Sequence, residues 1–288
     1  MFELKQSICY PGFKTPMCED AIGYGKNYCF VIDGASCLSG RNVVHPVSDS
    51  AWMAERVCHD LSVLLDENDP RPTRELLLEV VAQVRREYLQ ALQSIGIDAP
   101  EDSPSAGLAL FRQREGKLEF FGMGDCVGVA SLPDGSNFYA LDADLPRLDN
   151  QVLQKMQQLH LQTGISMAEA KKSCNDLLLQ NRCLRNKPEG YWILDLLTDD
   201  GIHNAQEEVW ELNAPVCVGA FSDGFAQLSE IFKQYENYIS LFEAMQTKDL
   251  EEMFQSLCRL QDADADCSQY PRFKLRDDTC ALWGVFHP

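Results

Sequence analysis

Acidic residues stand at the ends of apolar, strand-like stretches in several separate parts of this 288-residue chain. These residues are Glu19, Asp20, Asp33, Asp125, Asp223, Asp277 and Asp278. Glycine directly follows Asp33 and Asp223 and directly precedes Asp125. An Asp-Gly pair is most often a simple turn. The alternative is that the carboxylates are held at strand ends, where they act together on a ligand.

Carboxylates that meet at one place need a cation. Like charges a few ångström apart raise one another's pKa, so a bare cluster is unstable unless positive charge neutralises it. Mg²⁺ and Mn²⁺ prefer oxygen ligands, and glycine beside a ligand lets its own carbonyl coordinate as well. Two such ions lower the pKa of a bridging water and stabilise the attacking and leaving oxygens of a displacement. The predicted chemistry is metal-assisted hydrolysis of a phosphate ester, with no covalent nucleophile.

The composition narrows the range of partners. The chain carries a formal net charge of −19, with 45% hydrophobic and 24% charged residues. The negative electrostatic field of such a charge repels phosphate backbones and anionic lipids, so we expect neither nucleic acid nor a membrane as a partner. The opening residues "MFELKQSICYPGF" show no secretory signal, and no stretch approaches the roughly 18 apolar residues of a membrane span, which predicts a cytoplasmic protein. An anionic substrate needs a local cation, which bound metal ions supply.

Strands are predicted from short apolar and aromatic runs, and helices from apolar positions at helical spacing. The expected strands fall within 1–10, 27–33, 105–141, 190–197, 214–223 and 279–286, and the expected helices within 48–67, 73–95, 150–185 and 227–261. Strands and helices do not alternate regularly, which favours an α+β fold with mostly antiparallel sheets over a doubly wound parallel sheet. No linker or repeat divides the chain, so we expect one domain.

The acidic motifs occur in an order that resembles the metal-dependent serine/threonine phosphatases of the protein phosphatase 2C (PPM) family. They read "CEDA" at 18–21, "VIDGAS" at 31–36, "GDC" at 124–126, "FSDG" at 221–224 and "DDT" at 277–279. The resemblance spans nearly the whole chain. It implies a sandwich of two antiparallel β-sheets flanked by helices on both faces. It also implies a single phosphatase domain over 1–288, with a helical, flap-like insertion near 145–190 that contacts the substrate.

Site residues follow from the same resemblance. The implied metal ligands are Glu19, Asp33, Gly34, Asp125, Asp223 and Asp277. Asp33 resembles the carboxylate that bridges two Mg²⁺ or Mn²⁺ ions, and the carbonyl of Gly34 is a further ligand. Asp223 and Asp277 resemble ligands of one ion, and these two with Asp33 are the implied catalytic residues. Glu19 corresponds to a ligand that acts through water, and Asp125 to the position of a third, weaker ion.

The implied reaction is hydrolysis of phosphoserine and phosphothreonine in a phosphorylated protein substrate, by attack of a metal-bound hydroxide. Two positions depart from the family pattern. Thr15 replaces an arginine that grips phosphate in eukaryotic members, and Ala35 replaces a histidine, which leaves the general acid unassigned. Lys14, Arg41 and the basic run at 272–276 are the candidate phosphate contacts. The alternative function is a catalytically weak or inactive phosphatase-like protein that binds a phosphoprotein or a regulator.

Overall fold

The strand that carries Asp33 is buried on both faces. In the computed structural model this strand, β3 (Tyr28–Ala35), directs Ile32 into a core beneath a layer of helices and Val31 into a core between two sheets. Because successive side chains of a strand point to opposite faces, Asp33 shares the face of Val31. A strand buried on both faces explains why the sequence before Asp33 is apolar without a break.

The structure describes residues 1–12, 17–37, 40–98, 100 and 102–288. Within them, β3 belongs to a six-stranded antiparallel sheet. In spatial order its strands are β2 (Asp20–Tyr24), β3, β4 (Ser105–Arg114), β5 (Lys117–Met123) and β9 (Gln206–Glu211), and the short β8 (Leu194–Asp195) pairs with β4.

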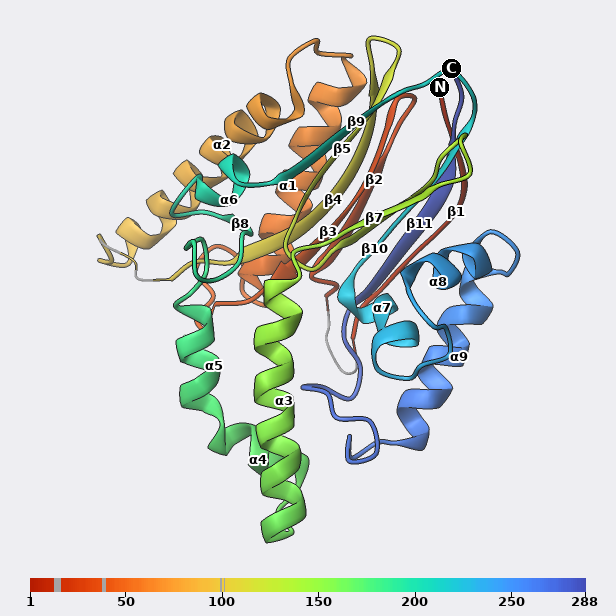
Figure 1. Ribbon diagram of the computed structural model, residues 1–288. Helices are drawn as coiled ribbons and strands as arrows, with labels where there is room; N and C mark the ends of the chain where they lie inside the picture. Colours follow the sequence, from red (N-terminus) through yellow and green to blue (C-terminus); the bar gives the residue numbers. More distant parts are fainter. Residues whose placement is uncertain (13–16, 38–39, 99, 101) are drawn as a thin grey trace.

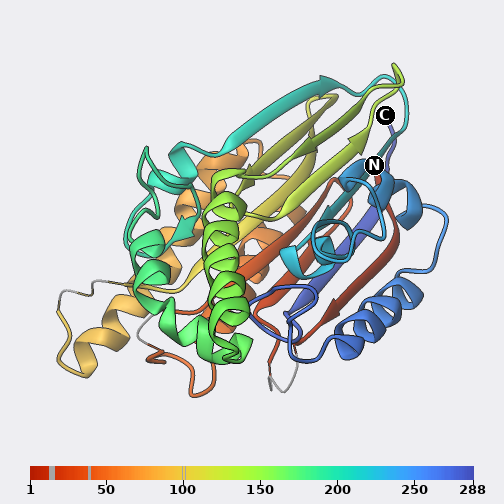
Figure 2. The same cartoon turned by 60° about the horizontal axis from the view of Figure 1, so that its bottom comes forward.

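The second sheet has five strands in the described part of the chain and is also antiparallel. Its strands, in spatial order, are β1 (Phe2–Tyr10), β11 (Thr279–Phe286), β10 (Val216–Phe221), β6 (Val127–Ser131) and β7 (Asn137–Ala140). The two sheets lie face to face, as Figures 1 and 2 show. Apolar side chains from both sheets fill the space between them.

Helices cover both outer faces of this sandwich. The six-stranded sheet carries α1 (Asp49–Asp66) and α2 (Thr73–Ser94), and the five-stranded sheet carries α7 (Asp223–Glu230), α8 (Tyr238–Met245) and α9 (Leu250–Ala263). A short helix, α6 (Asp200–His203), packs beside α2. The arrangement confirms the predicted α+β sandwich of two antiparallel sheets with helices on both faces (Figure 1).

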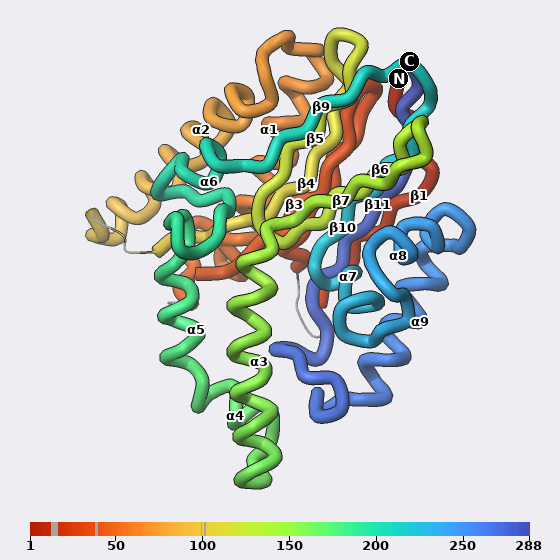
Figure 3. The backbone as a smooth tube through the Cα atoms, in the orientation of Figure 1, coloured from red at the N-terminus to blue at the C-terminus, as the bar shows by residue number. Residues whose placement is uncertain are grey.

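Three further helices extend from one end of the sandwich. They are α3 (Asp144–Thr163), α4 (Met167–Ser173) and α5 (Asn175–Arg182). They pack around a small apolar core to which Cys267 and Phe273, from the segment before β11, also contribute. Figure 3 shows them projecting away from the end where the two termini meet. There the amide of His287 donates to the carbonyl of Met1 at 2.9 Å. Among the described residues, no helix has both the length and the apolar character to cross a membrane.

Candidate metal centre

Asp33 and Asp223 meet although they are 190 residues apart and belong to different layers. Asp33 lies near the end of β3 in the six-stranded sheet, and Asp223 begins α7 directly after β10 of the five-stranded sheet. The backbone N–H of Asp223 donates to Oδ2 of Asp33 at 3.3 Å. The two sheets therefore bring these acidic residues to one edge of the sandwich.

The register of the five-stranded sheet brings two more acidic residues to this edge. Phe221, the last residue of β10, pairs with Val127 on β6 and with Ala281 on β11. Asp125 stands just before β6 and Asp277 just before β11. The strand ends that carry Asp125, Asp223 and Asp277 are therefore neighbours, as the sequence predicts for a cluster.

Asp33, Asp125, Asp223 and Asp277 lie close enough for their charges to affect one another. Burial raises the pKa of Asp33 well above its usual value, and the charges of Asp20 and Asp223 raise it further. Burial and then the charge of Asp277 do the same to the pKa of Asp223. Burial, with the charge of Asp149 next, raises the pKa of Asp125 to about 7. Carboxylates in mutual repulsion are what a divalent cation neutralises.

Asp20 joins this cluster, although the sequence motifs point to Glu19 instead. It is opposite Asp33 in the β2–β3 pairing, and the whole residue is only 5% exposed. Both carboxylate oxygens are buried without a hydrogen-bond partner among the described residues. A buried polar group without a partner costs free energy, and a cation or its bound water is a partner that suits a carboxylate.

The oxygen donors fit a hard divalent cation such as Mg²⁺ or Mn²⁺, which prefers carboxylates and carbonyls to nitrogen or sulfur. The side chains do not already form a closed cage. In the part of the chain that the structure describes, no three His, Cys, Asp or Glu side chains surround one point closely enough to hold an ion.

Glycine is required at two places where the backbone approaches the cluster. The N–H of Gly34 donates to the carbonyl oxygen of Glu19 at 3.1 Å. A Cβ atom on Gly34 would lie only 2.4 Å from the same oxygen. A Cβ atom on Gly224 would lie 1.9 Å from the carbonyl oxygen of Asp278. Both distances are far below van der Waals contact, so the glycines after Asp33 and Asp223 serve close packing.

The remaining predicted site residues are placed as follows. The carboxylate of Glu19 accepts hydrogen bonds from Ser36 Oγ at 2.8 Å and Ser48 Oγ at 2.6 Å. These bonds fix its orientation beside the cluster. Lys14 lies outside the described residues. Arg41 lies on the exposed segment between β3 and α1.

A cavity of about 80 Å³ opens from the aspartates toward α3. It is lined by Asp125, Pro146, Asp149, Asn150, Leu153, Asp223, Gln227, Glu230, Ile231, Arg272, Phe273, Lys274 and Asp277. Burial raises the pKa of Asp149 to about 6, although nearby Arg182 lowers it. The sequence analysis missed Asp149. Nothing in the sequence indicates that α3, which lies outside the sandwich, places this side chain beside the strand ends.

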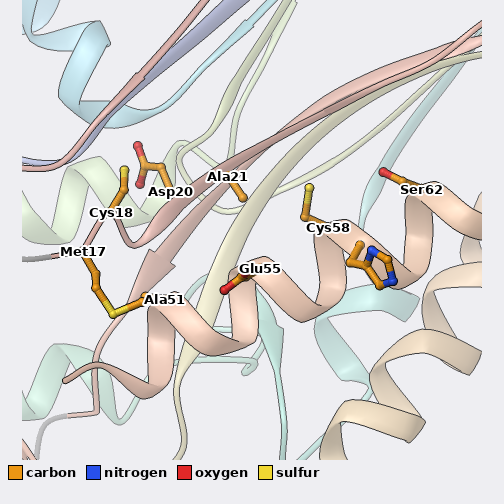
Figure 4. Close-up of a pocket in the computed structure, with 9 residues that line it drawn as sticks. Met17, Cys18, Asp20, Ala21, Ala51, Glu55, Cys58 and Ser62 are labelled. Carbon is orange, nitrogen blue, oxygen red and sulfur yellow. The ribbon is translucent and has the colours of Figure 1, made fainter. Parts of the chain in front are cut away.

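A second, larger pocket of about 480 Å³ lies along α1, on the other side of β2. Its lining residues are Met17, Cys18, Asp20, Ala21, Ala51, Glu55, Cys58, His59 and Ser62. Figure 4 shows Glu55, Cys58 and Ser62 on α1, while the carboxylate of Asp20 points away from this helix. That direction agrees with the pairing of Asp20 and Asp33 in the sheet. The carboxylate of Asp20 therefore belongs to the aspartate cluster, and the pocket touches it only at its edge.

A sequence model described as Protein phosphatase 2C matches residues 14–261. This range covers most of the chain. The chain belongs to the protein phosphatase 2C family. It is accordingly a metal-dependent protein phosphatase, a hydrolase, as the order of its acidic motifs predicts.

Solved structures of family members share the fold. The Mycobacterium tuberculosis serine/threonine phosphatase PstP/Ppp matches at 14% identity and a TM-score of 0.57, over 100% of both chains. The S. agalactiae serine/threonine phosphatase matches at 14% identity and a TM-score of 0.54, also over 100% of both chains. The catalytic domain of PstP in complex with 2 manganese ions matches at 16% identity and a TM-score of 0.53, over 99% of this chain and 98% of that one. No curated protein matches the chain.

Proposed function

We propose that this protein phosphatase hydrolyses phosphoserine and phosphothreonine monoesters of protein substrates, with two Mg²⁺ or Mn²⁺ ions at the aspartate cluster. When bound, the ions supply Lewis acidity and a water of lowered pKa. The proposal is supported by the convergence of carboxylates from both sheets, above all the contact between the Asp223 amide and Oδ2 of Asp33. A manganese-containing structure of similar fold supports the choice of cation.

The protein supplies the positions of the ligands. Asp33, Asp223 and Asp277 are the proposed principal ligands. Asp33 lies near the end of β3, Asp223 just after β10 and Asp277 just before β11. Gly34 is the proposed carbonyl ligand. Asp20, which shares the face of Asp33, is a new candidate for this group, in contact with an ion or with its water.

Two predicted positions take supporting roles in this proposal. Glu19, held by Ser36 and Ser48, acts through water. Asp125 and Asp149 face the same cavity at the side of α3, where a third, weaker ion would bind. The helices α3–α5 are the proposed flap that contacts the substrate, and α3 borders this cavity. A cytoplasmic location also stays a prediction.

The decisive experiment compares the hydrolysis of p-nitrophenyl phosphate and of a phosphothreonine peptide with Mn²⁺ and with EDTA. We expect Mn²⁺-dependent activity that Asp223→Asn lowers by about 10²–10³-fold, the usual loss when one electrostatic group of a site is removed. Asp134→Asn is the matched control. Its carboxylate accepts from Ser136 at the exposed turn between β6 and β7, at the opposite end of β6 from Asp125.

Activity that survives both EDTA and Asp223→Asn would contradict the proposal. Absence of any Mn²⁺-dependent hydrolysis by the unaltered protein, together with binding of the phosphopeptide, would favour the inactive, phosphoprotein-binding alternative instead. Hydrolysis of the small ester without hydrolysis of the phosphopeptide would contradict the proposed protein substrate.

A further inference from the structure

Lys274 lines the same cavity as Asp125, Asp223 and Asp277. It lies on the loop that leads into β11, and its Nζ is 2.6 Å from Oδ1 of Asp277. The ammonium group therefore neutralises a carboxylate that is a proposed metal ligand, in a chain of net charge −19.

Two other cations beside this loop, Arg272 and Lys171, have structural roles. Arg272 also lines the cavity, but it forms a buried ion pair with Asp264 at 2.6 Å, in which both side chains are only 3% exposed. Its other nitrogens donate to backbone carbonyls, including that of Gln261 at 3.1 Å. Lys171 on α4 donates to the carbonyl of Phe273 at 3.1 Å and so ties the loop to the helices beside it.

Lys274 differs from both because about half of its side chain is exposed and its ion pair joins two residues of one loop. It is 52% exposed, and a lysine carries its charge on a flexible four-carbon stem. Its ion pair with Asp277 spans only three residues on one loop, so a change of partner requires only rotation of the side chain. An ammonium at such a position acts as a point charge toward phosphate oxygens.

We propose that Lys274 binds the phosphate group of the substrate and that it exchanges partners when metal binds. In the metal-free protein the ammonium pairs with Asp277. A divalent ion on Asp277 takes over that carboxylate and repels the ammonium, which is then available to a phosphate at the mouth of the cavity. This inference rests on the proposed function, and it names the residue of this chain that recognises the anionic substrate.

The exchange predicts that loss of the Lys274 charge has opposite effects on Mn²⁺ affinity and on phosphate affinity. An ammonium that competes with metal for Asp277 weakens metal binding, whereas an ammonium that contacts phosphate strengthens phosphate binding. Removing the charge by Lys274→Met should therefore tighten Mn²⁺ binding to the metal-free protein by about 2–5-fold, the range of an exposed ion pair. The same change should weaken binding of inorganic phosphate to the Mn²⁺-loaded protein by about 10-fold or more, as for a charged hydrogen bond.

Both affinities are measured by isothermal titration calorimetry, with inorganic phosphate as the probe. Lys274→Arg should keep most of the phosphate affinity, since it keeps the charge. Lys117→Met is the matched control. Lys117 lies on β5 of the six-stranded sheet and pairs with Glu211 at 3.7 Å, whereas Lys274 precedes β11 of the five-stranded sheet. In turnover of p-nitrophenyl phosphate by Lys274→Met, KM should rise more than kcat falls.

Three results separate this inference from the proposed function. Unchanged phosphate affinity in Lys274→Met would overturn the inference while leaving the function intact. Loss of both Mn²⁺ and phosphate affinity would also overturn it, because it would mean that Lys274 only maintains the structure of the loop. Failure of the unaltered protein to bind Mn²⁺ at all would overturn the proposed function and the inference with it.

Discussion

Replacing Asp125 by asparagine should raise the free energy of unfolding of the metal-free protein at pH 8. Burial, and then the charge of Asp149, raises the pKa of Asp125 from 3.8 to about 7 in the folded protein. At pH 8 this carboxylate is ionised in both the folded and the unfolded state, and the ionised form is the less stable one in the folded state. Asparagine removes the charge and keeps the shape of the side chain.

The size of the effect follows from the shift in pKa. The pKa of Asp125 rises by about three, which corresponds to about 4 kcal/mol at about 1.4 kcal/mol for each pKa unit. This free energy is an upper limit, because neighbouring side chains relax around the charge. We therefore expect a gain of about 1–3 kcal/mol at pH 8. As the pH falls from 7 toward 4, the folded protein takes up a proton on Asp125 before the unfolded chain does. The wild type then recovers stability, and the difference between the two proteins shrinks.

The assay is urea unfolding in EDTA, followed by the fluorescence of the four tryptophans, at pH 8 and at pH 5. Asp134→Asn is the control, because hydrogen bonds from Ser136 lower the pKa of Asp134, and its loss should leave the protein slightly less stable at pH 8. A lower free energy of unfolding for Asp125→Asn than for the wild type, at both pH values, would refute the reasoning. It would mean that Asp125 is stabilised by its surroundings even without a cation.

Two further predictions concern the supports of the site, and both are measured by urea unfolding. Gly224→Ala should lower the free energy of unfolding by about 1–3 kcal/mol, because its Cβ would lie 1.9 Å from the carbonyl oxygen of Asp278; an unchanged midpoint would contradict the close packing. Arg272→Met should cost about 3–5 kcal/mol, because it leaves Asp264 buried without its partner. The double change Arg272→Met with Asp264→Leu should restore part of that loss, and no restoration would show that the ion pair is not the cause.

The strand that carries Asp33 could be predicted because a strand buried on both faces has a continuous apolar sequence, which here runs up to Asp33. The helical stripes of α1 and α2 are similarly clear, since each buries one face on the sheet. Because all these features depend on local pattern, the α+β class and the order of its main elements could be predicted without the structure.

Short and exposed strands could not be predicted in this way. β2 has only five residues, and Tyr24 at its end is exposed, so its pattern is too brief to show that Asp20 is opposite Asp33. β9, with the sequence "QEEVWE", is an edge strand with a charged surface. The strand predicted over 190–197 is wrong in extent, because only Leu194–Asp195 pairs with β4. Tyr191 and Ile193 of that segment pack with Leu148 in a small apolar cluster instead.

The neighbours of the aspartates also depend on tertiary structure. Sequence order shows which carboxylates stand at strand ends, but the approach of Asp149 from α3 depends on how that helix leaves the sandwich. The pairing of Lys274 with Asp277 depends on the path of a loop without regular secondary structure. Such contacts depend on packing between distant segments, and no periodic pattern records them.

Crystals grown with Mn²⁺ and measured at its absorption edge test the central claim most directly, since anomalous scattering locates the ions independently of any activity. We predict two strong peaks at the edge of the sandwich, in contact with the carboxylates of Asp33, Asp223 and Asp277. Peaks at other sites only, with these three side chains directed to solvent, would contradict the account.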